Sequence, residues 1–170
     1  MTKKTRFWYK ISYMKFFLIV LILIATLGIG YYWIKSPSKI AFTNNNIPNK
    51  FFVDYRVEEK YIGGEKYFLY IADTPQKREK GLSLSPFLVN NAGMIFYFDS
   101  KDYYSFWMKN MQYPIDIIFL DDTIIIDIFE KVQPESYPET FTAKKAANIV
   151  IELNAEDVKK NNLSIGDNIY

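Results

Sequence analysis

The 170-residue chain contains one long stretch, residues 16–34, in which no side chain carries a charge. An α-helix rises about 1.5 Å per residue, so a stretch of this length nearly covers a hydrocarbon layer of about 30 Å. Tyr31, Tyr32 and Trp33 lie at its far end, where amphipathic rings favour the membrane interface, and five basic residues precede it. The pattern predicts a transmembrane helix at residues 16–34 that follows a cytoplasmic basic segment, residues 1–15.

A cleaved secretory signal is the competing interpretation of the same stretch. Such a signal needs a shorter apolar region that is followed by a small-residue cleavage site. Gly28 and Gly30 are small, but residues 31–34 continue the apolar run beyond them. An uncleaved anchor is therefore favoured. We expect a single-pass protein of the cell membrane, with its N-terminus in the cytoplasm and its C-terminal domain outside the cytoplasm.

Cysteine and histidine are both absent from the chain. Their absence excludes disulfides, thiol nucleophiles, imidazole bases and the usual zinc sites, so neither a cofactor nor a metal site is expected. After residue 35 there are 15 basic and 19 acidic residues, a net charge of −4. Because phosphate binding needs a basic patch, no nucleic-acid partner is expected. The partners that remain are the membrane, a small polar ligand and an envelope protein.

The sequence beyond the apolar stretch divides into a linker and one domain. Residues 35–50 combine two prolines with a run of asparagines, which is typical of a tether. Residues 51–170 are numerous enough for a single hydrophobic core. Alternation of apolar and polar residues, together with Tyr- and Phe-rich runs, predicts strands. These strands are expected at residues 51–58, 66–71, 94–98, 124–128 and 149–153.

Helical signals are few and short. Asp73, Thr74 and Pro75 supply a helix start, and Gly81 ends the helix expected at residues 76–80. Further short helices are expected at residues 142–148 and 156–161, and a hairpin turn is expected at Asp121 and Asp122. The physical interpretation is a mainly β domain, a sandwich or a barrel, with short helical inserts.

Four sequence blocks carry a resemblance to a known family. They are Thr74-Pro75-x-x-Arg78-x-x-Gly81-Leu82, Gly93-Met94-Ile95-Phe96-x-Phe98, Phe106-Trp107-Met108-Lys109-Asn110 and Pro114-Ile115-Asp116-Ile117-Ile118-Phe119-Leu120. In these blocks the chain resembles the DUF192 (UPF0127) family over about residues 65–170. The resemblance implies a jelly-roll-like β-sandwich and an export signal or membrane anchor, but no established activity. Ser83, where a Met is usual, and Ala155-Glu156, in place of a small Ala-Gly turn, depart from the family pattern.

Asp116 is the first candidate functional residue. Strand alternation places it on the same face as Ile118 and Leu120, within a segment that is apolar on both faces. A carboxylate there must be paired, hydrogen-bonded or at the mouth of a cleft. The sequence leaves open whether Asp116 accepts backbone hydrogen bonds as a structural residue or serves a site.

Trp107 and Lys109 share one side of an extended segment, and the other side carries Phe106, Met108 and Asn110. An aromatic platform next to a cation suits a small polar ligand such as a sugar or an anion. The alternative is that Trp107 belongs to the core and that the Lys109 stem packs over it. Arg78 could pair with Asp116 or Glu152, or could hold a ligand carboxylate or phosphate.

Six residues are therefore candidate ligand-binding residues: Arg78, Trp107, Lys109, Asn110, Asp116 and Glu152. The favoured function is a small polar ligand-binding or accessory module. One alternative is a structural or assembly protein of the cell envelope that uses its aromatic surface. Another is a hydrolase in which Asp116 works with Glu152 or Asp99 as an acid/base pair.

Overall fold

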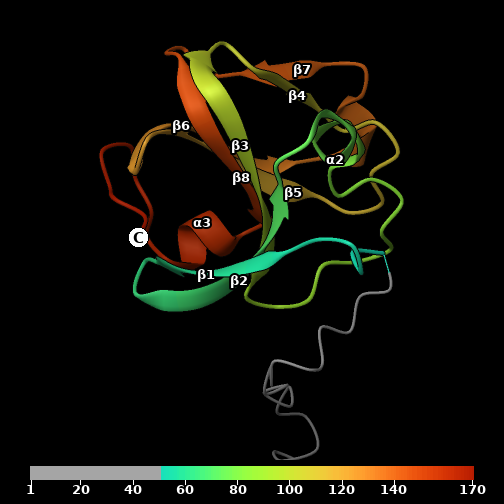
Figure 1. Ribbon diagram of the computed structural model, residues 1–170, viewed down its shortest axis with the longest axis horizontal. Coiled ribbons are helices and arrows are strands. Elements are labelled where there is room, and N and C mark those ends of the chain that lie inside the picture. Colours follow the sequence, from blue (N-terminus) through green and yellow to red (C-terminus); the bar gives the residue numbers. More distant parts are fainter. Residues whose placement is uncertain (1–50) are drawn as a thin grey trace, which may run out of the picture. The chain divides into compact units, whose positions relative to one another are not determined.

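The computed structural model describes residues 51–170 (Figure 1). The predicted transmembrane helix at residues 16–34 and the predicted linker at residues 35–50 lie outside the described residues. Within residues 51–170, none of the helices has the length and apolar character that a bilayer span requires.

Six of the strands in residues 51–170 form one mixed sheet with the order β1-β2-β3-β8-β5-β6. Their bounds are β1 Val57–Ile62, β2 Glu65–Ala72, β3 Ala92–Asp102, β5 Ile115–Asp121, β6 Ile124–Val132 and β8 Ala147–Asn154. Strands β2 and β3 run parallel, whereas the other neighbours in the sheet are antiparallel. Two short strands, β4 (Ser105–Trp107) and β7 (Thr140–Thr142), pair in a second sheet. The prediction of a mainly β fold is confirmed.

The large sheet does not close into a barrel, because β1 and β6 remain its two edges. The C-terminal segment lies between these edges instead (Figure 1). The backbone N–H of Tyr61 in β1 donates to the carbonyl oxygen of Tyr170 at 2.6 Å. On the other side, the backbone N–H of Ile125 in β6 donates to Asp167 at 2.9 Å. Of the two architectures expected, a sandwich or a barrel, the closed barrel is therefore wrong, because the large sheet is open and its edges are covered by the last residues of the chain.

The short helices agree with two of the three predictions. Helix α2 (Pro75–Lys80) begins where the Thr74 hydroxyl accepts a hydrogen bond from the backbone N–H of Lys77, and it ends at Gly81. Gly81 adopts φ 52° and ψ −140°, a backbone conformation that favours glycine. Helix α3 (Asp157–Lys160) falls within the second predicted segment. A 3₁₀ helix, η1 (Pro134–Ser136), adds one further turn.

Two predictions of local structure were wrong. The helix expected at residues 142–148 is absent, because Thr142 ends β7 and Ala147 begins β8, which pairs on both sides with β3 and β5. The strand expected at residues 51–58 begins only at Val57, because residues 51–54 form a turn that buries Phe52. In both cases long-range packing decides against the local signal.

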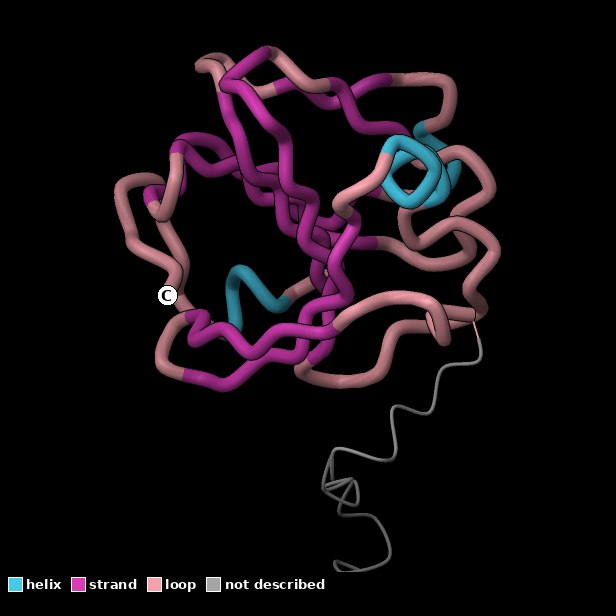
Figure 2. Tube along the Cα trace, viewed as in Figure 1, coloured by secondary structure: helices cyan, strands magenta, loops and turns pink. Residues whose placement is uncertain are grey.

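The large sheet separates two hydrophobic clusters, because successive residues of a strand point to opposite faces. In β3, Met94 and Phe96 belong to one cluster and Ile95 to the other. Figure 2 shows α2 and α3 on opposite sides of the central strands. The face toward α2 also carries the β4–β7 sheet, and this is the face that builds the site described below.

A glycine in β3 allows the close approach of the central strands. A Cβ at Gly93 would lie 2.7 Å from the carbonyl oxygen of Glu152 and 2.6 Å from a methyl group of Leu153. We expect Gly93→Ala to lower the free energy of unfolding by about 1–3 kcal/mol, because the added methyl group overpacks the sheet. Urea unfolding followed by circular dichroism would measure the loss. Ser100→Ala, at an exposed position of the same strand, is the control, and equal stabilities of the two variants would contradict the prediction.

Candidate functional site

The small β4–β7 sheet packs on the large one through Phe106. The ring centroid of Phe106 lies 4.9 Å from that of Phe96 and 5.7 Å from that of Phe119, in edge-to-face geometry. Phe106 is thereby part of the core packing, whereas the next residue of β4, Trp107, is exposed. Trp107 is 48% exposed, so it is a surface residue and not part of the core.

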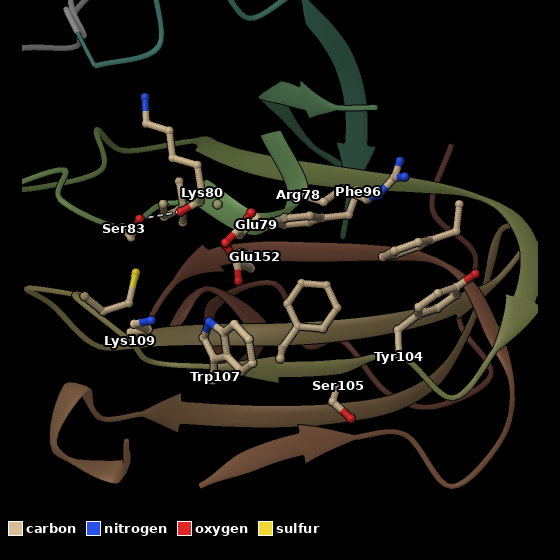
Figure 3. A pocket seen from close by; sticks show the side chains of 15 residues that line it. Arg78, Glu79, Lys80, Ser83, Phe96, Tyr104, Ser105, Trp107, Lys109 and Glu152 are labelled. Carbon is tan, nitrogen blue, oxygen red and sulfur yellow. Dashed lines mark hydrogen bonds between the residues drawn. The ribbon is translucent and has the colours of Figure 1, made fainter. Parts of the chain in front are cut away.

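A pocket of about 240 Å³ lies between α2, the small sheet and the large sheet (Figure 3). Its walls combine aromatic rings with charged side chains. It is lined by Arg78, Glu79, Lys80, Gly81, Leu82, Ser83, Phe96, Phe98, Tyr104, Ser105, Phe106, Trp107, Lys109, Met111 and Glu152. Four of the six predicted site residues therefore meet in one cavity, although they come from three separate parts of the sequence.

Glu152 lies on β8, on the face that points toward the pocket, and it is only 5% exposed. No atom of the described residues hydrogen-bonds its Oε2 atom. Burial raises the pKa of Glu152 from 4.5 to about 8, because the ionised form loses its hydration. At neutral pH Glu152 is therefore a neutral carboxylic acid, able to donate a hydrogen bond as well as to accept one.

The three cations of the pocket have different surroundings. Arg78 donates from Nη1 to the carbonyl oxygen of Tyr97 at 2.9 Å, and its guanidinium lies 5.1 Å from the ring centroid of Phe98. Lys80 donates from Nζ to the carbonyl oxygen of Phe51 at 3.0 Å. Figure 3 shows both side chains directed away from the space between Glu152 and Trp107. Within residues 51–170 neither of them, nor Lys109, forms an ion pair.

A second hollow of about 290 Å³ adjoins the pocket. It shares Trp107 and Lys109 with the pocket and adds Gln76 and Asn110. Asn110 follows β4 in a left-handed turn, at φ 59°. The predicted residue Asn110 therefore lies beside the pocket but does not line it.

Asp116 lies on the opposite face of the large sheet, in the cluster of Ile118 and Leu120. Its carboxylate is fully buried and accepts two backbone hydrogen bonds, from Lys131 at 2.8 Å and from Val158 at 2.9 Å. These bonds tie β6 and α3 to β5. The structure thus gives Asp116 the structural surroundings that the sequence left as one of two alternatives.

The sheet register also separates the carboxylates of the hydrolase hypothesis. Asp116 pairs with Leu153 and Ile117 pairs with Glu152, so the side chains of Asp116 and Glu152 point to opposite faces. Asp99 is exposed on β3 and does not line the pocket. The structure therefore forms neither of the acid/base pairs considered from the sequence.

Sequence reasoning missed most of the wall that α2 contributes. Glu79, Lys80, Gly81 and Ser83 line the pocket, but an exposed charge on a short helix carries no signal of its own. The signal that could have identified this wall is the block from Thr74 to Leu82. Its matching positions Pro75, Arg78 and Gly81 mark the start, the middle and the end of the helix, so the block points to the helix as a unit.

The comparison with protein-family models identifies the family. The model of the DUF192 family, described as Uncharacterized ACR, matches residues 58–170. No curated protein matches the chain.

Two crystal structures are similar to the chain. One is a candidate transcription regulator from Sinorhizobium meliloti 1021, which is 30% identical; the match covers 68% of this chain and 94% of that one, with a TM-score of 0.65. The other is a protein of unknown function from Novosphingobium aromaticivorans DSM 12444, which is 27% identical; that match covers 67% of this chain and 84% of the other, with a TM-score of 0.61. Because the family model matches residues 58–170, well over half of the chain, the chain belongs to the DUF192 family.

Proposed function

We propose that residues 51–170 form a binding domain for a small polar ligand, which occupies the pocket between Trp107 and Glu152. The observation that carries this proposal is the buried Oε2 atom of Glu152, which lines the pocket without a hydrogen-bond partner among the described residues. A buried polar atom left without a partner costs about 1–3 kcal/mol. A ligand that hydrogen-bonds Oε2 would recover this cost.

The size and the walls of the pocket support a small ligand. Pockets for drug-sized molecules measure about 300–1,000 Å³, so a cavity of about 240 Å³ suits a smaller molecule. Phe106 and the half-exposed indole of Trp107 offer flat apolar surface to such a molecule. Glu152 and Lys109 offer polar groups that fix its orientation. This combination of a mostly apolar wall with a few convergent polar groups is typical of binding sites.

The proposal includes the membrane anchor expected from the sequence. The uncharged residues 16–34 and the five basic residues before them support an N-terminus in the cytoplasm. The binding domain would then lie on the outer side of the membrane. It would act as an anchored binding or accessory module, exposed to ligands outside the cytoplasm.

A thermal-melt screen of the full-length protein in detergent tests this function, with sugars, nucleotides and organic acids as probes. We expect at least one class to raise the melting temperature, because a ligand at about 100 times its Kd adds about 2.7 kcal/mol of stability. Trp107→Ala should abolish the shift while leaving the melting temperature without ligand close to that of the wild type.

Tyr61→Ala, which removes another exposed aromatic side chain, is the matched control and should keep the shift. The proposal fails if no probe class shifts the melting temperature. It also fails if Trp107→Ala destabilises the protein by about 3–5 kcal/mol, as the loss of a core aromatic residue does.

A further inference from the structure

We propose that the ligand is a small carboxylic acid with an apolar body, whose carboxylate is held by Lys109, the indole N–H of Trp107 and the neutral carboxyl group of Glu152. This inference rests on the proposed function and names the chemical class of the ligand. Figure 3 shows Trp107 and Glu152 pointing into the same space from opposite walls, with Lys109 beside Trp107.

The charge of the pocket favours an anion. Arg78, Lys80 and Lys109 line it, and Glu79 is the one carboxylate that opposes them when Glu152 is neutral. Arg78 and Lys80 each hydrogen-bond a carbonyl oxygen, and within residues 51–170 neither is paired with a carboxylate. The lining therefore carries a formal charge of +2, and an anion that enters the pocket is attracted by it.

The polar groups that face the open space are hydrogen-bond donors. The ammonium group of Lys109 and the indole N–H of Trp107 donate only, and neither side chain has a hydrogen-bond partner within residues 51–170. Glu152 in its neutral form supplies a third donor. A carboxylate accepts hydrogen bonds and donates none, so it matches this set better than a hydroxyl group does. The guanidinium of Arg78 would suit a phosphate, but it already donates a hydrogen bond to the carbonyl oxygen of Tyr97.

The remaining walls are apolar and limit the rest of the ligand. Leu82, Phe96, Phe98, Phe106 and Met111 surround the space beside Glu152. A hydrated sugar ring would lose hydrogen bonds to water against these side chains, whereas a hydrocarbon or aromatic body would not. The ligand is therefore expected to be an acid with an apolar body.

Protonation of Glu152 then controls affinity, because an ionised Glu152 would repel the carboxylate of the ligand. Burial holds the pKa of Glu152 at about 8. The titratable and charged groups that surround it are Arg78, Glu79 and Lys80 on α2, Tyr104 and Lys109 around β4, and Tyr113 beyond them. Burial raises the pKa of Tyr113 to about 12, so its hydroxyl stays neutral up to pH 9. Affinity should be about tenfold lower at pH 9 than at pH 7.

Isothermal titration calorimetry with matched probes tests the ligand class on the full-length protein in detergent. Benzoate is compared with benzamide, and glucuronate with methyl glucoside, at pH 7. We expect benzoate to bind at least tenfold more tightly than benzamide and more tightly than either sugar. Equal binding of benzoate and benzamide, or tighter binding of methyl glucoside, would overturn the carboxylic-acid proposal but leave the binding function standing. Absence of heat with every probe would count against both.

Two variants test the roles of the named groups. Lys109→Met should weaken benzoate binding at least tenfold, whereas Lys145→Met, at an exposed position away from the pocket, should leave it unchanged. Glu152→Gln should bind benzoate as tightly at pH 9 as at pH 7, because the amide still donates but does not ionise. Circular dichroism at both pH values verifies that each variant is folded. The same tenfold loss at pH 9 in Glu152→Gln would overturn the role of Glu152.

Discussion

Asp116→Ala should lower the free energy of unfolding by about 2–4 kcal/mol. The variant leaves two backbone N–H groups, those of Lys131 and Val158, without the carboxylate that accepts their hydrogen bonds. A buried donor without a partner, such as the N–H of Val158, costs about 1–3 kcal/mol, and the half-buried N–H of Lys131 costs less. The two donors belong to β6 and to α3, so the loss loosens two elements at once. Urea unfolding of the full-length protein, followed by circular dichroism, measures the effect.

Two comparisons separate this effect from a general loss of charge. Asp99→Ala removes an exposed carboxylate from β3 and should change stability by less than about 0.5 kcal/mol. Asp116→Asn keeps one acceptor oxygen but turns an N–H group toward the second backbone donor. Its loss of unfolding free energy should therefore lie between those of Asp99→Ala and Asp116→Ala. If Asp116→Ala were as stable as Asp99→Ala, the carboxylate would not hold β6 and α3 in place.

The surroundings of Asp116 show how far the sequence could predict this fold. Alternation within β5 correctly placed Asp116 on the same face as Ile118 and Leu120. Its hydrogen-bond partners could not be predicted, because they lie 15 and 42 residues away along the chain. A period of two determines the face of a strand, but it contains no information about which distant backbone reaches that face.

The wrong helix at residues 142–148 has a related cause. The run Ala143-Lys144-Lys145-Ala146-Ala147 consists of residues with high helix propensity. Only the sheet topology reveals that Ala147 begins the strand that lies between β3 and β5. A central strand gains packing on both faces and hydrogen bonds on both edges, which together outweigh a few tenths of a kcal/mol of propensity per residue.

For the candidate site too, the sequence predicts which neighbouring residues share a side but not which distant residues join them. Trp107 and Lys109 are close in sequence, and their shared side follows from a short extended segment. Glu152 joins them only through the register of β8 with β3, where Met94 pairs with Glu152, and through α2, which covers that face. The depth at which Glu152 is buried depends on those neighbours, so its raised pKa could not be predicted from the sequence alone.

The free energy of unfolding should fall as the pH rises from about 5 to about 8. The pKa of Glu152 is about 8 in the folded protein and 4.5 ordinarily, so between these values the folded protein retains a proton that the unfolded chain releases. The stability that comes from the neutral carboxyl group is complete below pH 4.5. It is lost at about 1.4 kcal/mol per pH unit until Glu152 ionises near pH 8.

Glu152→Gln separates this contribution from other titrations, such as that of Asp157, whose pKa is also raised by burial. The variant should be more stable than the wild type by about 3 kcal/mol at pH 7 and nearly equal to it at pH 5, as urea unfolding at the two pH values would show. Glu79→Gln removes an exposed carboxylate of the same pocket, and its free energy of unfolding should change with pH as that of the wild type does.

If the free energies of unfolding of the wild type and of Glu152→Gln changed with pH in the same way, Glu152 would be ionised and hydrated in the folded protein. If Glu152→Gln is more stable than the wild type and binds benzoate equally well at pH 7, the carboxyl group of Glu152 costs the protein stability at neutral pH. Its part in binding is then to donate a hydrogen bond, which the amide of the variant also does.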